Sequence, residues 1–186
     1  MGINSLIKFL RKPAYEVDPE PSPAYRLRTS ASLLAWALLI GLGLALLLGL
    51  IEAYVPYDLD EHALETLMET YSPLTILILA SLVAPVLEEL LFRGPMWYFR
   101  NSRYFPAFFY LFTLAFALVH LGNYPNLFEI WPISPLLISP QFILGLFLGF
   151  IRIRFGLIWC IGFHAAYNTV LLAPLLLLHE LEIPLS

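Results

Sequence analysis

Residues 73–99 read PLTILILASLVAPVLEELLFRGPMWYF, and Glu88, Glu89 and Arg93 are the only charged residues among them. The hydrocarbon core of a bilayer requires about 20 predominantly apolar residues of α-helix, so this stretch predicts a membrane-spanning helix. An ionisable side chain inside such a helix costs about 2.5–3.5 kcal/mol on insertion scales and marks a functional site by default. The stretch therefore predicts both the fold class and the place where chemistry is expected.

Four further apolar stretches cover roughly residues 31–55, 105–121, 135–151 and 155–178. The chain is 60% hydrophobic and 13% charged, whereas soluble domains contain about 25% charged residues. The apolar residues form long blocks and do not alternate, which argues against an outer-membrane barrel. We therefore predict an all-α polytopic membrane helix bundle of about five transmembrane spans, with the lipid bilayer as its surroundings. No basic stripe suggests a nucleic-acid partner.

The first residues, 3–12, predict a short amino-terminal amphipathic surface helix. Apolar residues recur there at helical spacing beside basic ones, namely Ile3, Leu6, Ile7 and Leu10 beside Lys8, Arg11 and Lys12. Such a helix suits an anionic bilayer surface, and a frayed tail is the alternative. Residues 13–28 are polar and contain prolines, which predicts a linker. The chain thus divides into a cytoplasmic amphipathic segment with a linker, 1–30, and a membrane-embedded domain, 31–186.

The distribution of Lys and Arg predicts the orientation of the spans. Outside the second span, these residues occur only before the first span and in the links after the second and fourth spans, as Lys8, Arg11, Lys12, Arg26, Arg28, Arg100, Arg103, Arg152 and Arg154. The other links and the tail carry acidic residues and no Lys or Arg. This alternation favours five spans with a cytoplasmic amino terminus. An extra half-helix within residues 124–139 is an alternative.

Polar side chains on three of the spans are predicted to lie at similar depth. Counting 1.5 Å per residue from the cytoplasmic ends places Glu88 roughly 18 Å, His164 roughly 15 Å and His120 roughly 21 Å into the membrane. Asn168 follows His164 by about one turn, and Asn123 follows His120 closely. Helix packing would explain such groups one by one, whereas a proton or ion pathway would explain the whole cluster as well as a catalytic site does. Their shared depth favours a single site.

The residue types in this group suit hydrolysis of an amide by water. Glu89 and Arg93 are four residues apart, in the favourable order for an ion pair on one helix face. Glu88 points about 100° away and is left free to face a substrate. Glu88 can then act as a general base on a water that a histidine holds. A second histidine and the amide of Asn168 can donate hydrogen bonds to the oxyanion that forms.

Two histidines and a glutamate also form a known catalytic zinc set. Glu88, His120 and His164 are therefore candidate metal ligands, and zinc is an alternative to direct activation of water. Covalent catalysis is not favoured, because Cys160 lies one turn before His164 without further support. Phe116 lies one turn before His120 and can brace its ring. The candidate catalytic residues are Glu88, Glu89, His120, His164 and Asn168, with Arg93, Phe116 and Asn123 in support.

Three short motifs resemble those of the CAAX-protease and bacteriocin-processing family, also called the CPBP or Abi family, which includes the type II CAAX endopeptidases. Residues 88–94, EELLFRG, resemble its E-E-x-x-x-R motif, and residues 116–120, FALVH, resemble F-x-x-x-H. Residues 164–168, HAAYN, resemble H-x-x-x-N. The motifs occur in this order on separate predicted spans, within a family core of about residues 73–178.

The resemblance implies that residues 31–186 form an intramembrane endopeptidase domain whose substrate is a membrane protein or a lipidated peptide. Carried over by motif, Glu88 is the base and His120 holds the water. His164 and Asn168 then stabilise the oxyanion, and the neighbouring Glu–Arg pair supports the site. The expected location is the bacterial inner membrane. The competing hypotheses are a non-catalytic immunity or scaffold protein and, third, a proton-linked transporter.

Overall fold

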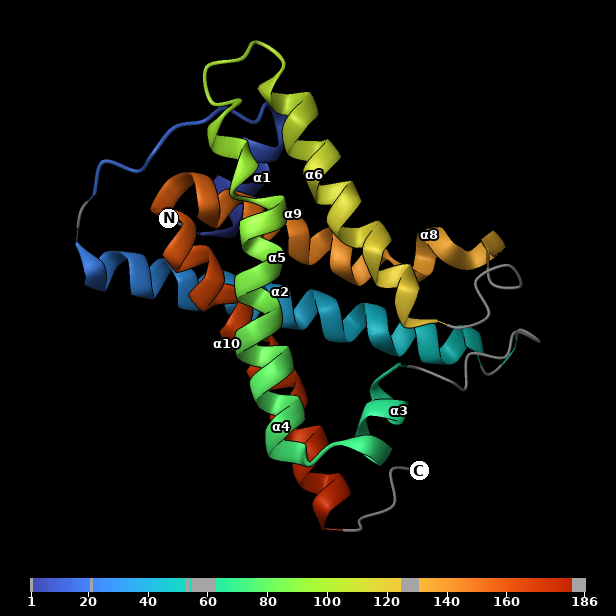
Figure 1. Ribbon diagram of the computed structural model, residues 1–186. Helices are drawn as coiled ribbons and strands as arrows, with labels where there is room; N and C mark the ends of the chain where they lie inside the picture. The colour runs from blue at the N-terminus through green and yellow to red at the C-terminus, as the bar shows by residue number, and fades with distance from the viewer. Residues whose placement is uncertain (1, 21, 53, 55–62, 125–130, 182–186) are drawn as a thin grey trace.

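The computed structural model describes residues 2–20, 22–52, 54, 63–124 and 131–181, and within these ranges it is helical and contains no strand (Figure 1). The helices are α1 Ile3–Arg11, α2 Pro23–Glu52, α3 Ala63–Thr70, α4 Pro73–Ile78, α5 Ala84–Phe92, α6 Phe105–Val119, α8 Ser134–Leu137, α9 Ser139–Phe155 and α10 Leu157–Glu180. The predicted all-α class is confirmed.

Five helical stretches of the described residues are long and apolar enough to cross a membrane. They are Pro23–Ile51, Pro73–Trp97, Phe105–Asn123, Trp131–Phe155 and Leu157–Glu180. Their number agrees with the prediction, and the chain is an integral membrane protein. The second stretch is continuous through α4, a π-helical turn at Leu79–Val83 and α5.

The predicted start of the first span is wrong. α2 begins at Pro23, eight residues before the predicted residue 31. Proline is favourable at the first position of a helix, because its fixed φ is already helical and its missing N–H would have no partner there. The polar residues that follow, including Arg26, therefore belong to the first turns of α2. The linker predicted for residues 13–28 is correspondingly shorter.

The predicted end of the fourth span is also wrong. α9 continues to Phe155 and ends at Gly156, which has a φ of 98° that side-chain-bearing residues rarely adopt. Arg152 and Arg154, predicted to lie in a link, therefore occupy the last turn of α9. Cations are favourable there because the helix dipole places negative charge at the carboxy-terminal end.

The segment before α9 resembles the alternative half-helix in part. A single 3-10 turn at Trp131–Ile133 leads into α8, and α8 leads into α9. The rest of that region, residues 125–130, lies outside the described residues. Several acidic residues that entered the orientation prediction also lie outside them: Asp58, Asp60, Glu61, Glu129 and Glu182.

The predicted amino-terminal helix is confirmed as α1, and the structure adds what its apolar face contacts. Leu6 and Phe9 are buried against the bundle, with 2% and 6% of their surface exposed. The Phe9 ring meets the rings of Phe109 and Phe150 edge-on, each at a centroid distance of 5.2 Å. The basic side chains Lys8, Arg11 and Lys12 are exposed. α1 is therefore a docked helix and not a frayed tail.

α9 lies at the centre of the bundle and contacts α1, α2, α6 and α10. Two glycines of α9, four residues apart, permit close packing against α6. A Cβ atom at Gly149 would lie 2.5 Å from the Phe109 ring of α6. A Cβ atom at Gly145 would lie 3.0 Å from Thr113 and 3.2 Å from the guanidinium of Arg93. The missing side chains therefore let α6 approach α9 closely, which brings two of the site's helices together.

Candidate active site

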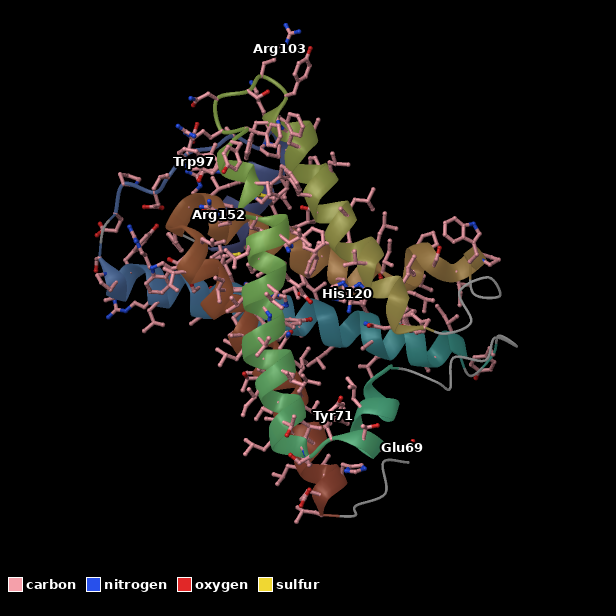
Figure 2. All side chains as sticks on the ribbon, in the orientation of Figure 1. Glu69, Tyr71, Trp97, Arg103, His120 and Arg152 are labelled. Carbon is pink, nitrogen blue, oxygen red and sulfur yellow. The ribbon has the colours of Figure 1, made fainter. Side chains whose placement is uncertain are left out.

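Side chains from α5, from the end of α6 and from α10 meet at a cavity inside the bundle, and Figure 2 shows His120 near the middle of the molecule. The cavity has a volume of about 410 Å³, and its polar lining residues are Glu88, His120, Asn123, Gln141, His164, Tyr167 and Asn168. A second cavity of about 360 Å³ shares Glu88, His120, Asn123 and Asn168 with the first. The two cavities thus meet at the polar residues that the sequence singled out.

Glu89 is buried, and both of its carboxylate oxygens contact neighbouring side chains. Its Oε1 atom accepts hydrogen bonds from Arg93 Nη1 at 3.2 Å and from His164 Nδ1 at 2.9 Å. Its Oε2 atom lies 2.9 Å from the sulfur of Cys160. The side chains of Glu89 and Arg93 are both 0% exposed. A buried carboxylate without partners would cost several kcal/mol, so these contacts explain how Glu89 is tolerated there.

Glu88 is placed differently from its neighbour. It lines both cavities, and 28% of its side chain is exposed. Its Oε2 atom lies 3.8 Å from His164 Nε2, the one ion-pair contact of this carboxylate within the part of the chain that the structure describes. Adjacent residues on a helix point about 100° apart, which is why one glutamate enters the core and the other faces the cavity.

His120 is held so that one ring nitrogen faces away from its own helix. Its Nδ1 atom lies 2.8 Å from the carbonyl oxygen of Phe116. Because a carbonyl only accepts, Nδ1 carries the proton, and Nε2 of the neutral ring is left as an acceptor. The ring also packs edge-on against Phe116 at a centroid distance of 4.8 Å. Phe116 therefore fixes both the tautomer and the orientation of His120.

His164 is oriented by the buried carboxylate. Nδ1 donates to Glu89, so the opposite nitrogen, Nε2, points toward Glu88. The Phe116 ring also contacts this imidazole edge-on, at a centroid distance of 5.8 Å. A carboxylate that accepts from one ring nitrogen fixes the orientation of the imidazole, as the hydrogen-bond partners of histidines do at metal sites.

Arg93 ties this network to α6 and α9. Its guanidinium lies over the Phe116 ring at 4.0 Å from the centroid, and Nη2 is 3.5 Å from the carbonyl of Gly145. Arg152 in turn donates from Nε to the main-chain carbonyl of Arg93 at 3.1 Å and from Nη1 to the hydroxyl of Tyr15 at 3.2 Å. Sequence reasoning missed this role of Arg152, because its position suggested a basic link.

The side-chain amide of Asn168 donates to a main-chain carbonyl in the π-helical turn of the second span. In the π-helical turn at Leu79–Val83, the N–H of Ala84 donates to Leu79, five residues back. The next donor in that pattern would serve the carbonyl of Ala80, but residue 85 is a proline and has no N–H. The amide nitrogen of Asn168 donates to this carbonyl at 2.7 Å. One N–H of the Asn168 amide is therefore engaged with the π-helical turn, and the amide nitrogen carries a second N–H that can also donate.

Several cavity residues were not among the sequence candidates. Tyr167 is 6% exposed and lines the larger cavity, as do Gln141 and Gly41. Helical spacing could have found Tyr167, since it lies three residues after His164 and so on a neighbouring face. Cys160 lies four residues before His164, and the same spacing explains why both contact Glu89.

The zinc alternative requires metal-ligating side chains that lie close together in the structure. Among the described residues, no group of three or more His, Cys, Asp or Glu side chains is close enough together to hold a metal ion. The candidate set Glu88, His120 and His164 therefore lacks the compact arrangement that a three-ligand zinc site requires.

Comparison with protein families gives a match that covers the polar residues of the larger cavity. The family model described as type II CAAX prenyl endopeptidase Rce1-like matches residues 70–170, which is more than half of the chain. The matched region contains Glu88, Glu89, Arg93, His120, His164 and Asn168. A search of curated proteins and a search of solved structures each give no significant match. The chain, with five membrane helices around this polar cavity, belongs to the Rce1-like family of type II CAAX endopeptidases.

Proposed function

We propose that this intramembrane endopeptidase hydrolyses a peptide bond of a membrane-associated substrate with a water that Glu88 activates. The observation that carries the proposal is the unequal placement of the two glutamates. Glu89 is enclosed by Arg93, His164 and Cys160, whereas Glu88 faces the junction of both cavities. A general base must reach solvent and substrate, and only Glu88 of the two does so.

The steps follow from the positions of the polar atoms. Nε2 of His120 accepts a hydrogen bond from a water and holds it beside Glu88. The Glu88 carboxylate takes one proton of that water as its oxygen bonds to the scissile carbonyl carbon. The carbonyl oxygen becomes an oxyanion, which accepts from the second amide N–H of Asn168 and from Nε2–H of His164. The His164 ring is then an imidazolium, because its Nδ1 also donates to Glu89. Glu88 then passes its proton to the leaving nitrogen as the C–N bond breaks.

The substrate and the setting are part of the same proposal. The cavities lie among membrane-spanning helices, so the substrate is a membrane protein or a lipidated peptide that reaches them from the bilayer or its surface. The family name refers to prenylated CAAX sequences, and a lipidated peptide is consistent with it. The charge distribution supports a cytoplasmic amino terminus, and the bacterial inner membrane is the proposed location.

The test is cleavage by Glu88→Gln, a substitution that keeps the size of the side chain. Wild type, Glu88→Gln and Glu180→Gln are purified in detergent and matched by circular dichroism and melting temperature. Each is incubated with a library of membrane peptides, and products are read by mass spectrometry. Glu180 is exposed at the end of α10 and serves as the matched control.

We expect Glu88→Gln to lose cleavage by about 10²–10⁴-fold, the usual contribution of a general base, and Glu180→Gln to cleave as wild type does. Equal cleavage by wild type and Glu88→Gln would refute the role of Glu88. A parallel arm with 1,10-phenanthroline tests the metal: loss of wild-type cleavage that added zinc restores would replace direct activation with a zinc mechanism. A chain without any cleavage would favour the immunity or scaffold alternative.

A further inference from the structure

The two cavities that meet at Glu88 differ in the chemistry of the walls that they do not share. The described residues that line only the smaller cavity, of about 360 Å³, are all apolar: Ile76, Leu79, Ala84 and Val119. Those that line only the larger cavity include three polar side chains, namely Gln141, His164 and Tyr167. His164 is already engaged in the proposed mechanism, so Gln141 and Tyr167 are polar groups of the larger cavity that still lack a role.

The hydroxyl of Tyr167 is held at the wall of the larger cavity without a hydrogen-bond partner in the described part of the chain. The residue lies on α10 and is 6% exposed, and its hydroxyl lies against Gly41 of α2, where a Cβ atom would overlap it. Buried tyrosine hydroxyls usually find a partner, because an unpaired one costs free energy. This hydroxyl is therefore available to a ligand that enters the cavity.

Gln141 offers a second hydrogen-bonding group in the same cavity. It lies in the first turn of α9 and is half-buried, and its side-chain amide has no hydrogen-bond partner among the residues that the structure describes. The amide donates through its nitrogen and accepts through its oxygen, and a tyrosine hydroxyl does both through one atom. The larger cavity thus presents donors and acceptors from two helices, and neither side chain is charged.

Uncharged donors and acceptors suit the main chain of a peptide. Water can attack a peptide carbonyl only where the substrate main chain is unwound, and an unwound chain has lost its helical hydrogen bonds. Inside a membrane protein, each N–H or C=O group that then stays unpaired is costly. A peptide group has one N–H and one C=O, so a cavity that takes an unwound segment needs partners for both. Among the walls that the cavities do not share, only that of the larger cavity offers them.

We propose that Tyr167 and Gln141 bind the main chain of the substrate on one side of the scissile bond, so that the larger cavity holds the unwound peptide segment. This inference rests on the proposed peptidase function and names two residues that hold the substrate for it. The Tyr167 hydroxyl donates to a substrate carbonyl, and the Gln141 amide pairs with a neighbouring peptide group. Fixing the main chain in this way positions the scissile carbonyl at Glu88 and Asn168, which line both cavities.

The competing interpretation is that Tyr167 and Gln141 only fill space between the helices that surround the cavity. Tyr167→Phe and Gln141→Met separate the two interpretations, because each removes hydrogen-bonding atoms and nearly keeps the size of the side chain. If the residues only pack, both substitutions should affect every ligand of the cavity alike. If they bind the main chain, the loss should depend on the peptide groups of the ligand.

The test compares two uncharged probes that carry the same dodecanoyl chain. The first continues as a tetrapeptide amide of alanine and leucine. The second is its ester twin, in which oxygen replaces each peptide N–H between residues, so that donors are lost and the carbonyls accept more weakly. Binding to the protein in lipid nanodiscs is read as protection of Ala45→Cys, a position that lines the larger cavity, from a maleimide. The chain's own cysteine, Cys160, is 0% exposed and gives the unlabelled background.

The parent protein carries Ala45→Cys together with Glu88→Gln, which limits turnover, and mass spectrometry checks that both probes stay intact. Tyr167→Phe and Gln141→Met are each added to this parent. Tyr98→Phe is the matched control, because it also removes a tyrosine hydroxyl but lies at a position that is 78% exposed and lines neither cavity.

We expect Tyr167→Phe and Gln141→Met each to raise the dissociation constant of the peptide probe about 5–150-fold, because a buried polar group of the ligand loses its partner. The same substitutions should raise the dissociation constant of the ester twin by a smaller factor, and Tyr98→Phe should bind both probes as the parent does.

Equal losses for the two probes would overturn the proposal in favour of packing. Unchanged affinity for the peptide probe in both variants, or failure of that probe to protect position 45 in the parent, would overturn it as well. A loss in one variant alone would remove the other residue from the proposal. Neither probe has to be cleaved, so a failed cleavage assay would refute the proposed function separately.

Discussion

Replacing Gly41 with alanine is expected to disturb the active-site cavity through one contact with Tyr167. Gly41 lies on α2 and Tyr167 on α10, and both line the larger cavity. A Cβ atom at Gly41 would overlap the Tyr167 hydroxyl, whereas the ring carbon behind that oxygen would lie 3.4 Å away, at ordinary contact distance. The conflict thus involves the hydroxyl alone.

The expected changes in the free energy of unfolding follow from these contacts. Forcing a methyl group into a packed contact usually costs about 1–3 kcal/mol, because side chains or helices must shift. Tyr167→Phe removes only the hydroxyl and should cost about 1 kcal/mol or less. In the double variant the ring meets the new methyl group without overlap, so the cost of Gly41→Ala should largely disappear. The expected coupling energy is about 1–2 kcal/mol in favour of the double variant, within the range for residues in contact.

The assay is reversible unfolding in mixed micelles of a mild detergent and SDS, followed by circular dichroism, for the wild type, the two single variants and the double variant. Gly43→Ala is the matched control, because it lies on the same helix and a Cβ atom there would have nothing within 4 Å. We expect Gly43→Ala to unfold as wild type does. The reasoning would be refuted if the losses in free energy of unfolding from Gly41→Ala and Tyr167→Phe simply added in the double variant. It would also be refuted if Gly43→Ala lost as much as Gly41→Ala.

Two further predictions concern buried contacts between the helices that carry the site. Arg93→Met leaves a buried carboxylate without its cation and should lower the free energy of unfolding by about 3–5 kcal/mol, whereas Arg11→Met at the exposed surface should change it by less than about 0.5 kcal/mol. Gly149→Ala places a methyl group 2.5 Å from the Phe109 ring and should cost about 1–3 kcal/mol. Gly162→Ala, with nothing within 4 Å of its Cβ position, should be close to neutral, and micellar unfolding measures all four.

The helix content and the number of spans could be predicted from the sequence, because a long apolar segment in a membrane has few alternatives to a spanning α-helix. The ends of the spans could not be predicted equally well, since polar residues can begin or end a helix without interrupting it. Arg26 and Arg152 both looked like residues of a link, yet they lie in the first turns of α2 and the last turn of α9. The boundaries instead fall at a proline, where α2 begins at position 23, and at the glycine that follows α9 at position 156.

Within the site, residue spacing correctly predicted the pairing of Glu89 with Arg93, which the structure shows at 3.2 Å. Spacing along one helix could not reveal contacts between helices, and these decide the arrangement of the other groups. His164 donates to Glu89 from a different span, and the Asn168 amide donates to the main chain of residue 80. The second contact was unpredictable without the π-helical turn, because in an ordinary α-helix Pro85 would leave the carbonyl of residue 81 unpaired and not that of residue 80.

The partners of Glu89 also bear on how the protein is made. The carboxylate sits on α5 beside Arg93 of the same span, but His164 and Cys160 reach it from α10, which is synthesised some 70 residues later. During translation, the second span therefore enters the membrane with its charge only partly compensated. The full set of partners exists only after α10 has inserted and packed against α5. Assembly of the last span and completion of the polar site are thus one event, and an intermediate that lacks α10 lacks two of the three side-chain partners of Glu89.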